Sequence, residues 1–406
     1  MTVGPSGQQA RQRLKISLLS ASHPISNKQR NNASFTLSYK AECRQQRPIN
    51  DSTFATAKNM AKFIPRAVFP PQLNLIRSYF LGHHAAALSK IKALLSSIDL
   101  VIECRDYRVP LTSRNPQFEQ ALSGVARLVI YTKKDLASKN RRSDYMRQEI
   151  MKAWHAPQPT FFTSCYSKPD MNALLSYIVD HASRTQSLLG SRVLVVGMPN
   201  VGKSALLNAL RGAGMNNHTK AARTGAQPGI TRKIATSVNI VPKDGRTGFE
   251  GVSLVDTPGV FVPFVPDGES MLKMTLVGSV KEKLIAPTLL CDYLLYQINR
   301  QPDGPKFYAK YCPPTNDVVE FLESVCGKTG MLGKGGEPDM DRAALWMMYR
   351  WRHGHLGAFI LDDVVEDGLM NKTNEEIGTS VSQARKLAKE AQRARGKARH
   401  AASIAV

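Results

Sequence analysis

The stretch "VLVVGMPNVGKSALLNAL", residues 193–210, decides the fold. An apolar run rich in valine leads into Gly197, Gly202, Lys203 and Ser204 in the spacing G-x-x-x-x-G-K-S, and a helix-forming run follows. Glycine at these positions lets the backbone curl so that successive N–H groups point at phosphate oxygens, and the helix N-terminus adds partial positive charge. The pattern therefore predicts a phosphate-binding loop between a strand and a helix.

Each residue type in this loop has an expected role. Lys203 would reach the β- and γ-phosphates, and the hydroxyl of Ser204 would bind Mg²⁺. The residues of the loop that we expect to contact nucleotide are Asn200, Val201, Gly202, Lys203, Ser204 and Ala205.

A second segment, "LVDTPG" at 254–259, predicts the metal side of the same site. Its strand would deliver Asp256 toward Mg²⁺, through a water molecule, and Gly259 would offer its N–H to the γ-phosphate. Between the two motifs, Thr231 in "AQPGITRK" is the best candidate for a switch threonine that completes the Mg²⁺ shell. A plain turn residue is the alternative for Thr231. The predicted metal ligands are thus Ser204, Thr231 and Asp256.

The segment "VIYTKKDLA", residues 129–137, is typical of a guanine-reading segment. A carboxylate at Asp135 accepts bonds from N1–H and the 2-amino group of guanine, whereas adenine leaves it unpaired, and such sites reject the wrong base strongly. The stem of Lys133 would lie along the base plane, beside Lys134. Thr132 stands where Asn is commonest. The rival "NKTNE" at 371–375 has Asn374 in place of the required Asp and no apolar strand before it.

A third contact to the base is expected one strand and helix later, in "FFTSCYSKPDM" at 161–171. We expect Thr163, Ser164 and Cys165 to form a loop in which a backbone N–H meets guanine O6. An ordinary loop at the end of a strand is the alternative.

The base-reading segments precede the phosphate loop, so the order of a usual GTP-binding chain is rotated. Strand-like runs alternate with helical runs from residue 99 onward, which predicts an α/β fold with a parallel-rich central sheet. A parallel sheet tolerates the rotation because joining old termini and cutting elsewhere leaves spatial neighbours unchanged. The segment after "DTPG" then runs directly into a helical region, so nucleotide state would be coupled to a second domain.

Composition bounds the partners. The 406 residues include 55 Lys or Arg against 32 Asp or Glu, a formal charge of +23, which favours a polyanionic neighbour: nucleic acid, or an anionic membrane surface. Six scattered cysteines form no C-x-x-C pair, which argues against a zinc ribbon or a disulfide framework. We expect no transmembrane segment, because "APTLLCDYLLYQI" is too short and contains Asp292.

Residues 1–40 contain six Lys or Arg and no Asp or Glu, a composition typical of an organelle transit peptide; a disordered basic tail is the alternative. Helical patterns are expected at 268–285, 315–326 and 340–354, and a basic run ends the chain. The predicted organisation is a transit peptide and flexible leader at 1–65, a permuted G domain at 66–265, a helical RNA-binding domain at 266–370 and a basic tail at 371–406.

Five segments together carry a family resemblance: "YFLGHHAAAL" (79–88), "DLVIECRDYRVPLTSRNP" (99–116), "GMPNVGKS" (197–204), "DTPGV" (256–260) and "GMLGKGGEPDMDRAA" (330–344). With them the chain resembles the circularly permuted GTPases of the YlqF/RbgA type, which assist assembly of the large ribosomal subunit, and their mitochondrial counterparts. The likeness runs from about Ser78 to Asp363. Tyr107 replaces the usual Ala, and Ala87 stands where a Lys is frequent.

The resemblance implies further roles. Many GTPases orient the attacking water with a Gln directly after D-x-x-G, but Val260 occupies that position here. The resemblance points to His83 as the replacement, with His84 as a competitor. Asn200 resembles a position that helps hold K⁺ against the phosphates.

The leading hypothesis is a GTP-hydrolysing assembly factor for the mitochondrial large ribosomal subunit, which binds GTP, GDP and rRNA in the matrix. One alternative is a nucleotide-gated RNA-binding scaffold with little catalysis, which Val260 favours. The other is a peripheral GTPase on the matrix face of the inner membrane, held by the basic tail.

Overall fold

The computed structural model describes residues 63–378 apart from 73–74, 76–81, 123, 139, 186, 188–189, 216–221, 223–236, 263–264 and 266. Most of the predicted leader, Thr231 and residues 379–406 of the predicted tail lie outside the described residues.

A six-stranded sheet forms the centre of the first half of the described chain, in the order β3-β2-β1-β4-β6-β5. Its strands are β1 (Leu100–Asp106), β2 (Arg127–Thr132), β3 (Thr160–Phe162), β4 (Ser191–Gly197), β5 (Val238–Val241) and β6 (Val252–Asp256). All neighbours pair in parallel except β5, which runs antiparallel to β6 at the edge. The carboxyl ends of the five parallel strands therefore meet at one edge, where ligands bind in folds of this class.

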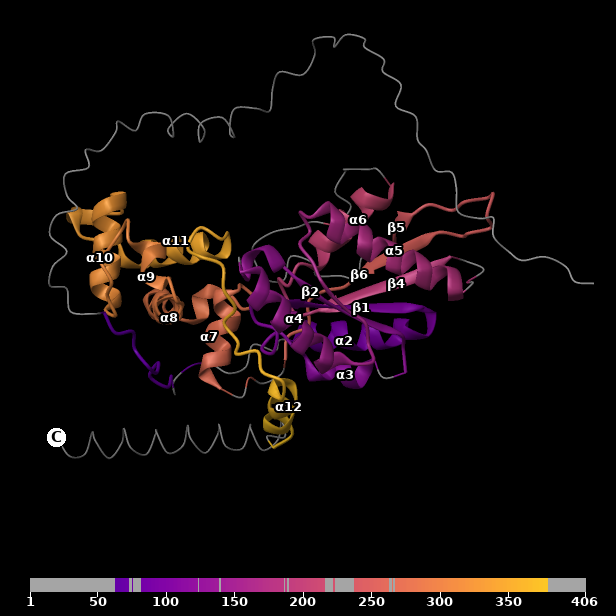
Figure 1. Ribbon diagram of the computed structural model, residues 1–406, viewed down its shortest axis with the longest axis horizontal. Coiled ribbons are helices and arrows are strands. Elements are labelled where there is room, and N and C mark those ends of the chain that lie inside the picture. Colours follow the sequence, from indigo (N-terminus) through magenta and orange to yellow (C-terminus); the bar gives the residue numbers. More distant parts are fainter. Residues whose placement is uncertain are drawn as a thin grey trace, which may run out of the picture. The chain divides into compact units, whose positions relative to one another are not determined.

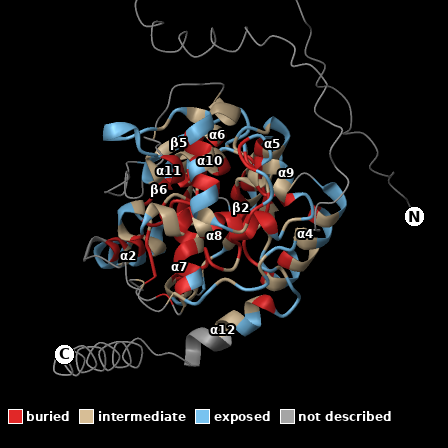
Figure 2. Ribbon diagram, turned by 90° about the vertical axis from the view of Figure 1, so that its left-hand side faces the viewer, coloured by how far each residue is buried: buried red, intermediate tan, exposed pale blue. Residues whose placement is uncertain are grey.

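Helices cover both faces of the sheet (Figure 1). One face is covered by α2 (Gly82–Leu94), α3 (Pro116–Ala121) and α4 (Arg141–His155), and the other by α5 (Lys168–Thr185) and α6 (Lys203–Met215). Because both faces are covered, every residue of β1 is buried. Figure 2 shows buried residues gathered in the interior and exposed residues around them. Side-chain caps help to set the helix starts: Asn115 accepts from the N–H of Gln117, and Asn140 accepts from two N–H groups of α4.

The chain beyond β6 is helical, as predicted. Its helices are α7 (Gly268–Leu276), α8 (Pro287–Asn299), α9 (Gly304–Tyr308), α10 (Val318–Thr329), α11 (Met340–Arg352) and α12 (Gly368–Gly378). Single 3-10 turns span Leu95–Ser97, Lys134–Leu136, Glu282–Leu284 and Lys334–Gly336.

One expectation needs correction here, and one segment had no predicted structure. The helix expected at 268–285 ends at Leu276, because Gly278 takes a left-handed conformation with φ +84° and turns the chain. The run "APTLLCDYLLYQI" was considered only as a membrane stretch, whereas α8 lies in the interior of the helical region, with nine of its residues buried. Among the described residues, no helix combines the length and apolar character needed to cross a bilayer.

Candidate nucleotide site

The phosphate loop joins β4 to α6 in the conformation that its glycines were expected to supply. Gly197 and Gly202 have φ of +148° and +97°, and a Cβ at Gly197 would collide with the carbonyl oxygen of Cys104. Asn200 also takes a left-handed conformation, with φ +61°. α6 begins at Lys203, so Ser204 and Ala205 lie in its first turn, where backbone N–H groups face an anion.

Lys203, Ser204 and Asp256 lie together where the loop meets α6, on the side predicted to bind the metal. Ser204 Oγ donates a 2.5 Å hydrogen bond to Asp256 Oδ2, and Lys203 Nζ donates to the carbonyl of Met198 at 2.8 Å. The other carboxylate oxygen, Asp256 Oδ1, is buried without a hydrogen-bond partner within the described part of the chain. Burial raises the pKa of Asp256, against the opposing effects of Ser204 and Lys203, and burial lowers the pKa of Lys203.

These groups fit a hard cation beside phosphate. A hydroxyl and a carboxylate are oxygen ligands of the kind that Mg²⁺ prefers, with phosphate oxygens and water completing its shell. The described residues contain no cluster of three or more His, Cys, Asp or Glu that would hold a metal without a phosphate ligand. Thr231, the third predicted ligand, lies outside the described residues.

The loop after β6 folds directly onto the phosphate loop. A Cβ at Gly259 would lie 2.5 Å from the Cα of Pro199, so only glycine permits this approach. The N–H of Val260 donates to the carbonyl of Gly197 at 3.2 Å. Val260 itself is fully buried in the apolar cluster beneath α2, so its side chain cannot contact an attacking water.

Helix α2 is attached to the same loop through His84. The Nδ1 atom of this buried side chain lies 3.0 Å from the carbonyl oxygen of Gly259. In the tautomer that carries its proton on Nδ1, His84 donates to that carbonyl. His83 precedes it within α2, but the His83 side chain lies outside the part of the chain that can be described.

The predicted guanine-reading segment, 129–137, lies against the phosphate loop in space, although it is some sixty residues earlier in sequence. Thr132 Oγ1 donates to the carbonyl of Val201, so a threonine at the usual Asn position still holds this loop. Lys133 takes a left-handed conformation with φ +59°, and its Nζ donates to the carbonyl of Asn200 at 2.6 Å. Thr132 is fully buried and Lys133 partly so.

The loop after β3 joins the same edge. The N–H of Lys134 donates to the carbonyl of Thr163 at 3.2 Å. Asp135 follows Lys134 in the 3-10 turn Lys134–Leu136, so this bond brings its backbone close to the loop. Burial raises the pKa of Cys165 to about 11, reinforced by the negative charge of Asp135 and opposed by Lys133. The hydroxyl of Thr163 is buried and has no hydrogen-bond partner among the described residues.

Ser164 differs from the expectation in one detail. Its backbone N–H already donates to Asp170 Oδ2 at 3.0 Å, and its hydroxyl accepts from the N–H of Tyr166. The N–H of Cys165 is therefore the better candidate for a contact with guanine O6.

Asp106 and Arg108 appeared in the sequence analysis only within the family-like segment 99–116, and no contact with the candidate site was predicted for them. Asp106, the last residue of β1, accepts a 2.8 Å bond from Lys133 Nζ, and Arg108 Nε and N–H each bond Asp106 Oδ1 at 3.0 Å. The signal that was available is the run of charged residues in "ECRDYR", residues 103–108, at the end of a buried strand.

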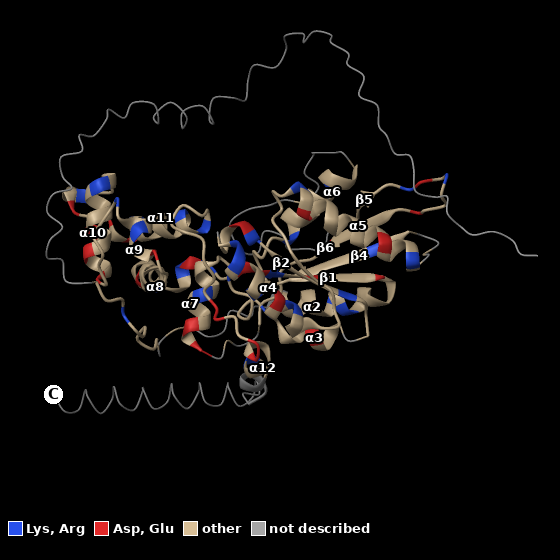
Figure 3. Cartoon of the chain, in the orientation of Figure 1, with Lys and Arg blue, Asp and Glu red and all other residues tan. Residues whose placement is uncertain are grey.

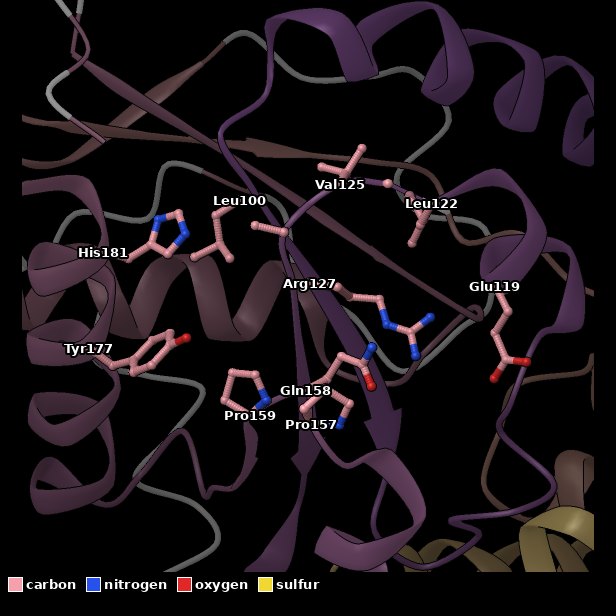
Figure 4. Close-up of a pocket in the computed structure, with 12 residues that line it drawn as sticks. Leu100, Glu119, Leu122, Val125, Arg127, Pro157, Gln158, Pro159, Tyr177 and His181 are labelled. Atoms are coloured by element: carbon pink, nitrogen blue, oxygen red, sulfur yellow. The ribbon is translucent and has the colours of Figure 1, made fainter. Parts of the chain in front are cut away.

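A separate cavity of about 510 Å³ lies at the opposite, amino-terminal edge of β1, β2 and β3. Figure 4 shows Arg127, Glu119, Tyr177 and His181 around it. None of the residues lining this cavity belongs to the nucleotide-binding motifs.

Comparisons of the sequence with known proteins identify the family of the chain. Residues 192–322 match the family model described as "50S ribosome-binding GTPase". The chain is 34% identical over 334 residues to "Mitochondrial GTPase 1" of Schizosaccharomyces pombe, covering 77% of this chain and 97% of that protein. It is 31% identical over 319 residues to "Mitochondrial ribosome-associated GTPase 1" of Mus musculus, covering 73% of this chain and 93% of that protein.

Among solved structures, GNP-bound YlqF from T. maritima is similar at 23% identity and a TM-score of 0.47, covering 68% of this chain and 97% of that one. The sequence relationship decides the assignment, since more than nine tenths of the length of both named relatives is matched. With its phosphate loop, its D-x-x-G segment and its base-reading segments in rotated order, the chain is a GTPase that belongs to the mitochondrial GTPase 1 family.

Proposed function

We propose that this GTPase assists assembly of the large subunit of the mitochondrial ribosome, in the matrix, and that it contacts rRNA. The support is the family model, described as ribosome-binding, and the mouse relative, named as ribosome-associated. The nucleotide-binding part of the proposal is supported by the hydrogen bond from Lys133 to the carbonyl of Asn200. This bond connects the segment proposed to read the base with the loop proposed to bind the phosphates. Contact with the matrix face of the inner membrane remains a prediction from sequence.

The proposed chemistry divides the site into three parts. Asp135 and the N–H of Cys165 read the guanine base, and Thr132, Lys133 and Lys134 with Thr163 and Ser164 hold these readers at the loop. Residues 200–205 surround the phosphates with N–H groups, and Lys203 supplies a cation to the β- and γ-phosphates. Ser204, Asp256 and Thr231 would hold Mg²⁺, which neutralises charge that develops on the phosphate oxygens.

His83 is the proposed water-orienting group. Support comes from its neighbour, since His84, in the first turn of α2, contacts the carbonyl of Gly259 in the loop after β6. Val260 is excluded from this role, because its apolar side chain is buried away from the site, and another group must orient the water. Asn200, at the left-handed turn of the loop, is the proposed K⁺ contact. Equal rates of GTP hydrolysis in KCl and NaCl would contradict the proposal that Asn200 contacts K⁺.

The charge distribution bears on the RNA contact. The proposed G domain, 66–265, holds 26 Lys or Arg against 12 Asp or Glu, whereas the proposed helical domain, 266–370, holds 11 against 15. Figure 3 shows acidic positions in red beside basic positions in blue along α7 and α10. We therefore propose that the G domain and the basic tail, 371–406, supply most phosphate contacts, and that exposed Tyr349 of α11 offers a stacking surface.

The test is GTP turnover by the full chain with and without purified mitochondrial large ribosomal subunits, with small subunits at equal concentration as the control. We expect GTP turnover to rise at least several-fold with large subunits only. GTP turnover that rises equally with both subunits would reduce the proposal to general RNA affinity. Turnover that large subunits leave unchanged would contradict it.

A further inference from the structure

Arg108 lies between the nucleotide site and the helical region. Its backbone N–H and Nε donate to Asp106 Oδ1 at 3.0 Å, and its Nη2 donates to Asp106 Oδ2 at 2.8 Å. On its other side the guanidinium stacks on the ring of Trp351, with 5.1 Å from Cζ to the ring centroid. Arg108 and Trp351 are both buried, so water does not compete with the contacts of Arg108 to Asp106 and to Trp351.

Asp106 shares its carboxylate between Arg108 and Lys133. Burial tends to raise the pKa of Asp106, but the two cations outweigh it and hold the pKa well below its usual range. The side chain of Asp106 therefore remains a carboxylate. It holds Arg108 and Lys133 in fixed positions on either side of it. Lys133 in turn donates to the carbonyl of Asn200 in the phosphate loop. The chain of contacts thus runs from Trp351 through Arg108, Asp106 and Lys133 to Asn200.

A second route leads from the same end of α11 to the same loop residue. Arg352 donates from Nε to the carbonyl of Leu276 at 2.5 Å and from Nη2 to that of Thr275 at 2.7 Å, which binds it to the end of α7. Just after α7, the carbonyl of Gly278 accepts a 3.2 Å bond from Asn200 Nδ2. Both routes therefore connect the carboxyl end of α11 to Asn200. The route through Lys133 ends at the backbone carbonyl of Asn200, and the route through α7 ends at its side-chain amide.

Backbone contacts hold this arrangement together. The N–H of Leu361, in the segment after α11, donates to the carbonyl of Arg108 at 2.8 Å. Asp362 accepts bonds from the N–H groups of Leu111 and Thr112 at 2.9 and 2.8 Å. The loop after β1 is therefore bonded on both sides, to the guanine reader and to the helical region.

We propose that Arg108 is a positioning residue through which the packing of α11 sets the affinity of the site for guanine nucleotide. Loss of the Trp351 contact lets Arg108 and Asp106 relax, and Lys133 then no longer holds the base-reading segment against the phosphate loop. The coupling is reciprocal, so a macromolecule that displaces α11 weakens nucleotide binding by the same factor as nucleotide weakens that macromolecule. The inference rests on the proposed role of Lys133 beside the base.

The experiment measures the dissociation constants of mant-GDP and mant-ADP for the full chain and four variants. Trp351→Leu removes the stacking surface. Trp346→Leu is the control, the same substitution on the same helix at a side chain that meets Tyr311 edge to face and lies under Arg350. Arg108→Gln removes the link, and Trp351→Leu is also made in that background. Typical coupling free energies correspond to changes of roughly 5- to 150-fold.

We expect Trp351→Leu to raise the Kd for mant-GDP about tenfold, with Trp346→Leu within twofold of wild type. The preference for mant-GDP over mant-ADP should fall in parallel, which general loosening of the fold would not produce. In the Arg108→Gln background, Trp351→Leu should have little further effect. Equal effects of the two tryptophan substitutions, or additive effects in the double variant, would overturn the inference.

Thermal unfolding of each variant guards against misfolding. If Trp351→Leu does not fold, Arg108→Lys takes its place, because lysine keeps the charge and loses both the fork and the stacking. An unchanged Kd in Arg108→Lys then overturns the inference. A wild-type protein that binds mant-ADP as tightly as mant-GDP would instead contradict the proposed guanine site.

Discussion

Asp135→Asn isolates base recognition from folding. The Asp135 side chain is exposed, and no hydrogen bond or ion pair joins it to another side chain in the described part of the chain. The substitution therefore removes no contact that stabilises the fold, and the change in unfolding free energy should stay within about 0.5 kcal/mol. Any large effect on nucleotide affinity then reports the bound state alone.

The expected magnitude follows from the bonds lost. The carboxylate would accept from N1–H and from the 2-amino group of guanine, and hydrogen bonds to a charged group contribute about 1.5–3 kcal/mol each. Because Asp135 is exposed, the lower value applies, and two bonds give about 3 kcal/mol, or roughly 100-fold in Kd. The introduced amide N–H would also face the 2-amino donor. Xanthine carries a carbonyl at that carbon, so the variant should gain affinity for xanthosine diphosphate.

The assay is isothermal titration of GDP, xanthosine diphosphate and ADP into wild type, Asp135→Asn and the control Asp180→Asn. Asp180 is an exposed acid on α5 outside the candidate site, so its substitution makes the same charge change. A GDP affinity reduced less than fivefold, or an equal loss for ADP, would refute the placement of Asp135 at the base. Comparable losses in both variants would reduce the effect to net charge.

Three further predictions address the metal, catalysis and pH. Ser204→Ala should abolish the tightening of GTP binding by Mg²⁺, measured as the ratio of Kd with Mg²⁺ to Kd with EDTA; an unchanged ratio would exclude Ser204 as a ligand. His83→Ala should lower single-turnover kcat about 100-fold with GTP affinity unchanged, and a rate equal to wild type would favour the scaffold alternative. Burial, assisted by Arg105, Arg127 and Arg114, lowers the pKa of His155 from 6.5 to about 2. Only the unfolded chain then gains a proton on this group below pH 6.5, so stability should fall by about 2 kcal/mol between pH 6.5 and 5; urea unfolding of His155→Gln should show a smaller loss, and an equal loss would place the proton elsewhere.

Sequence reasoning recovered the elements whose patterns are local. Valine-rich runs ending in glycine or aspartate marked β4 and β6, and the rotated order followed from "TKKD" preceding "GMPNVGKS". α8 was missed because its apolar residues are nearly continuous, interrupted only by Asp292 and Gln297, so that no single apolar face stands out in the sequence. The antiparallel direction of β5 was also not predicted, since a single strand's direction depends on the path of the connection before it.

The site was predictable where one motif carries it and unpredictable where partners are distant in sequence. Lys133 was named from its own motif, but its bond to Asp106 joins residues 27 apart. The contact of Arg108 with Trp351 spans a still longer separation, and neither residue type identifies the other as its neighbour. His84 was named only as a competitor of His83, whereas its buried contact with Gly259 depends on how α2 crosses the sheet.

The central position of β1 has a consequence for how the chain is made. β1 pairs with β2 on one side and with β4 on the other, yet β4 begins some ninety residues after it. During synthesis, which begins at the amino end, β1, β2 and β3 can therefore pair into a three-stranded sheet while the other edge of β1 is still unpaired. Such an apolar edge is open to foreign strands until the valine-rich strand arrives. Moving the phosphate loop to the later half of the molecule thus exposes its neighbour during synthesis, and holding nascent chains at this stage should be a task for chaperones.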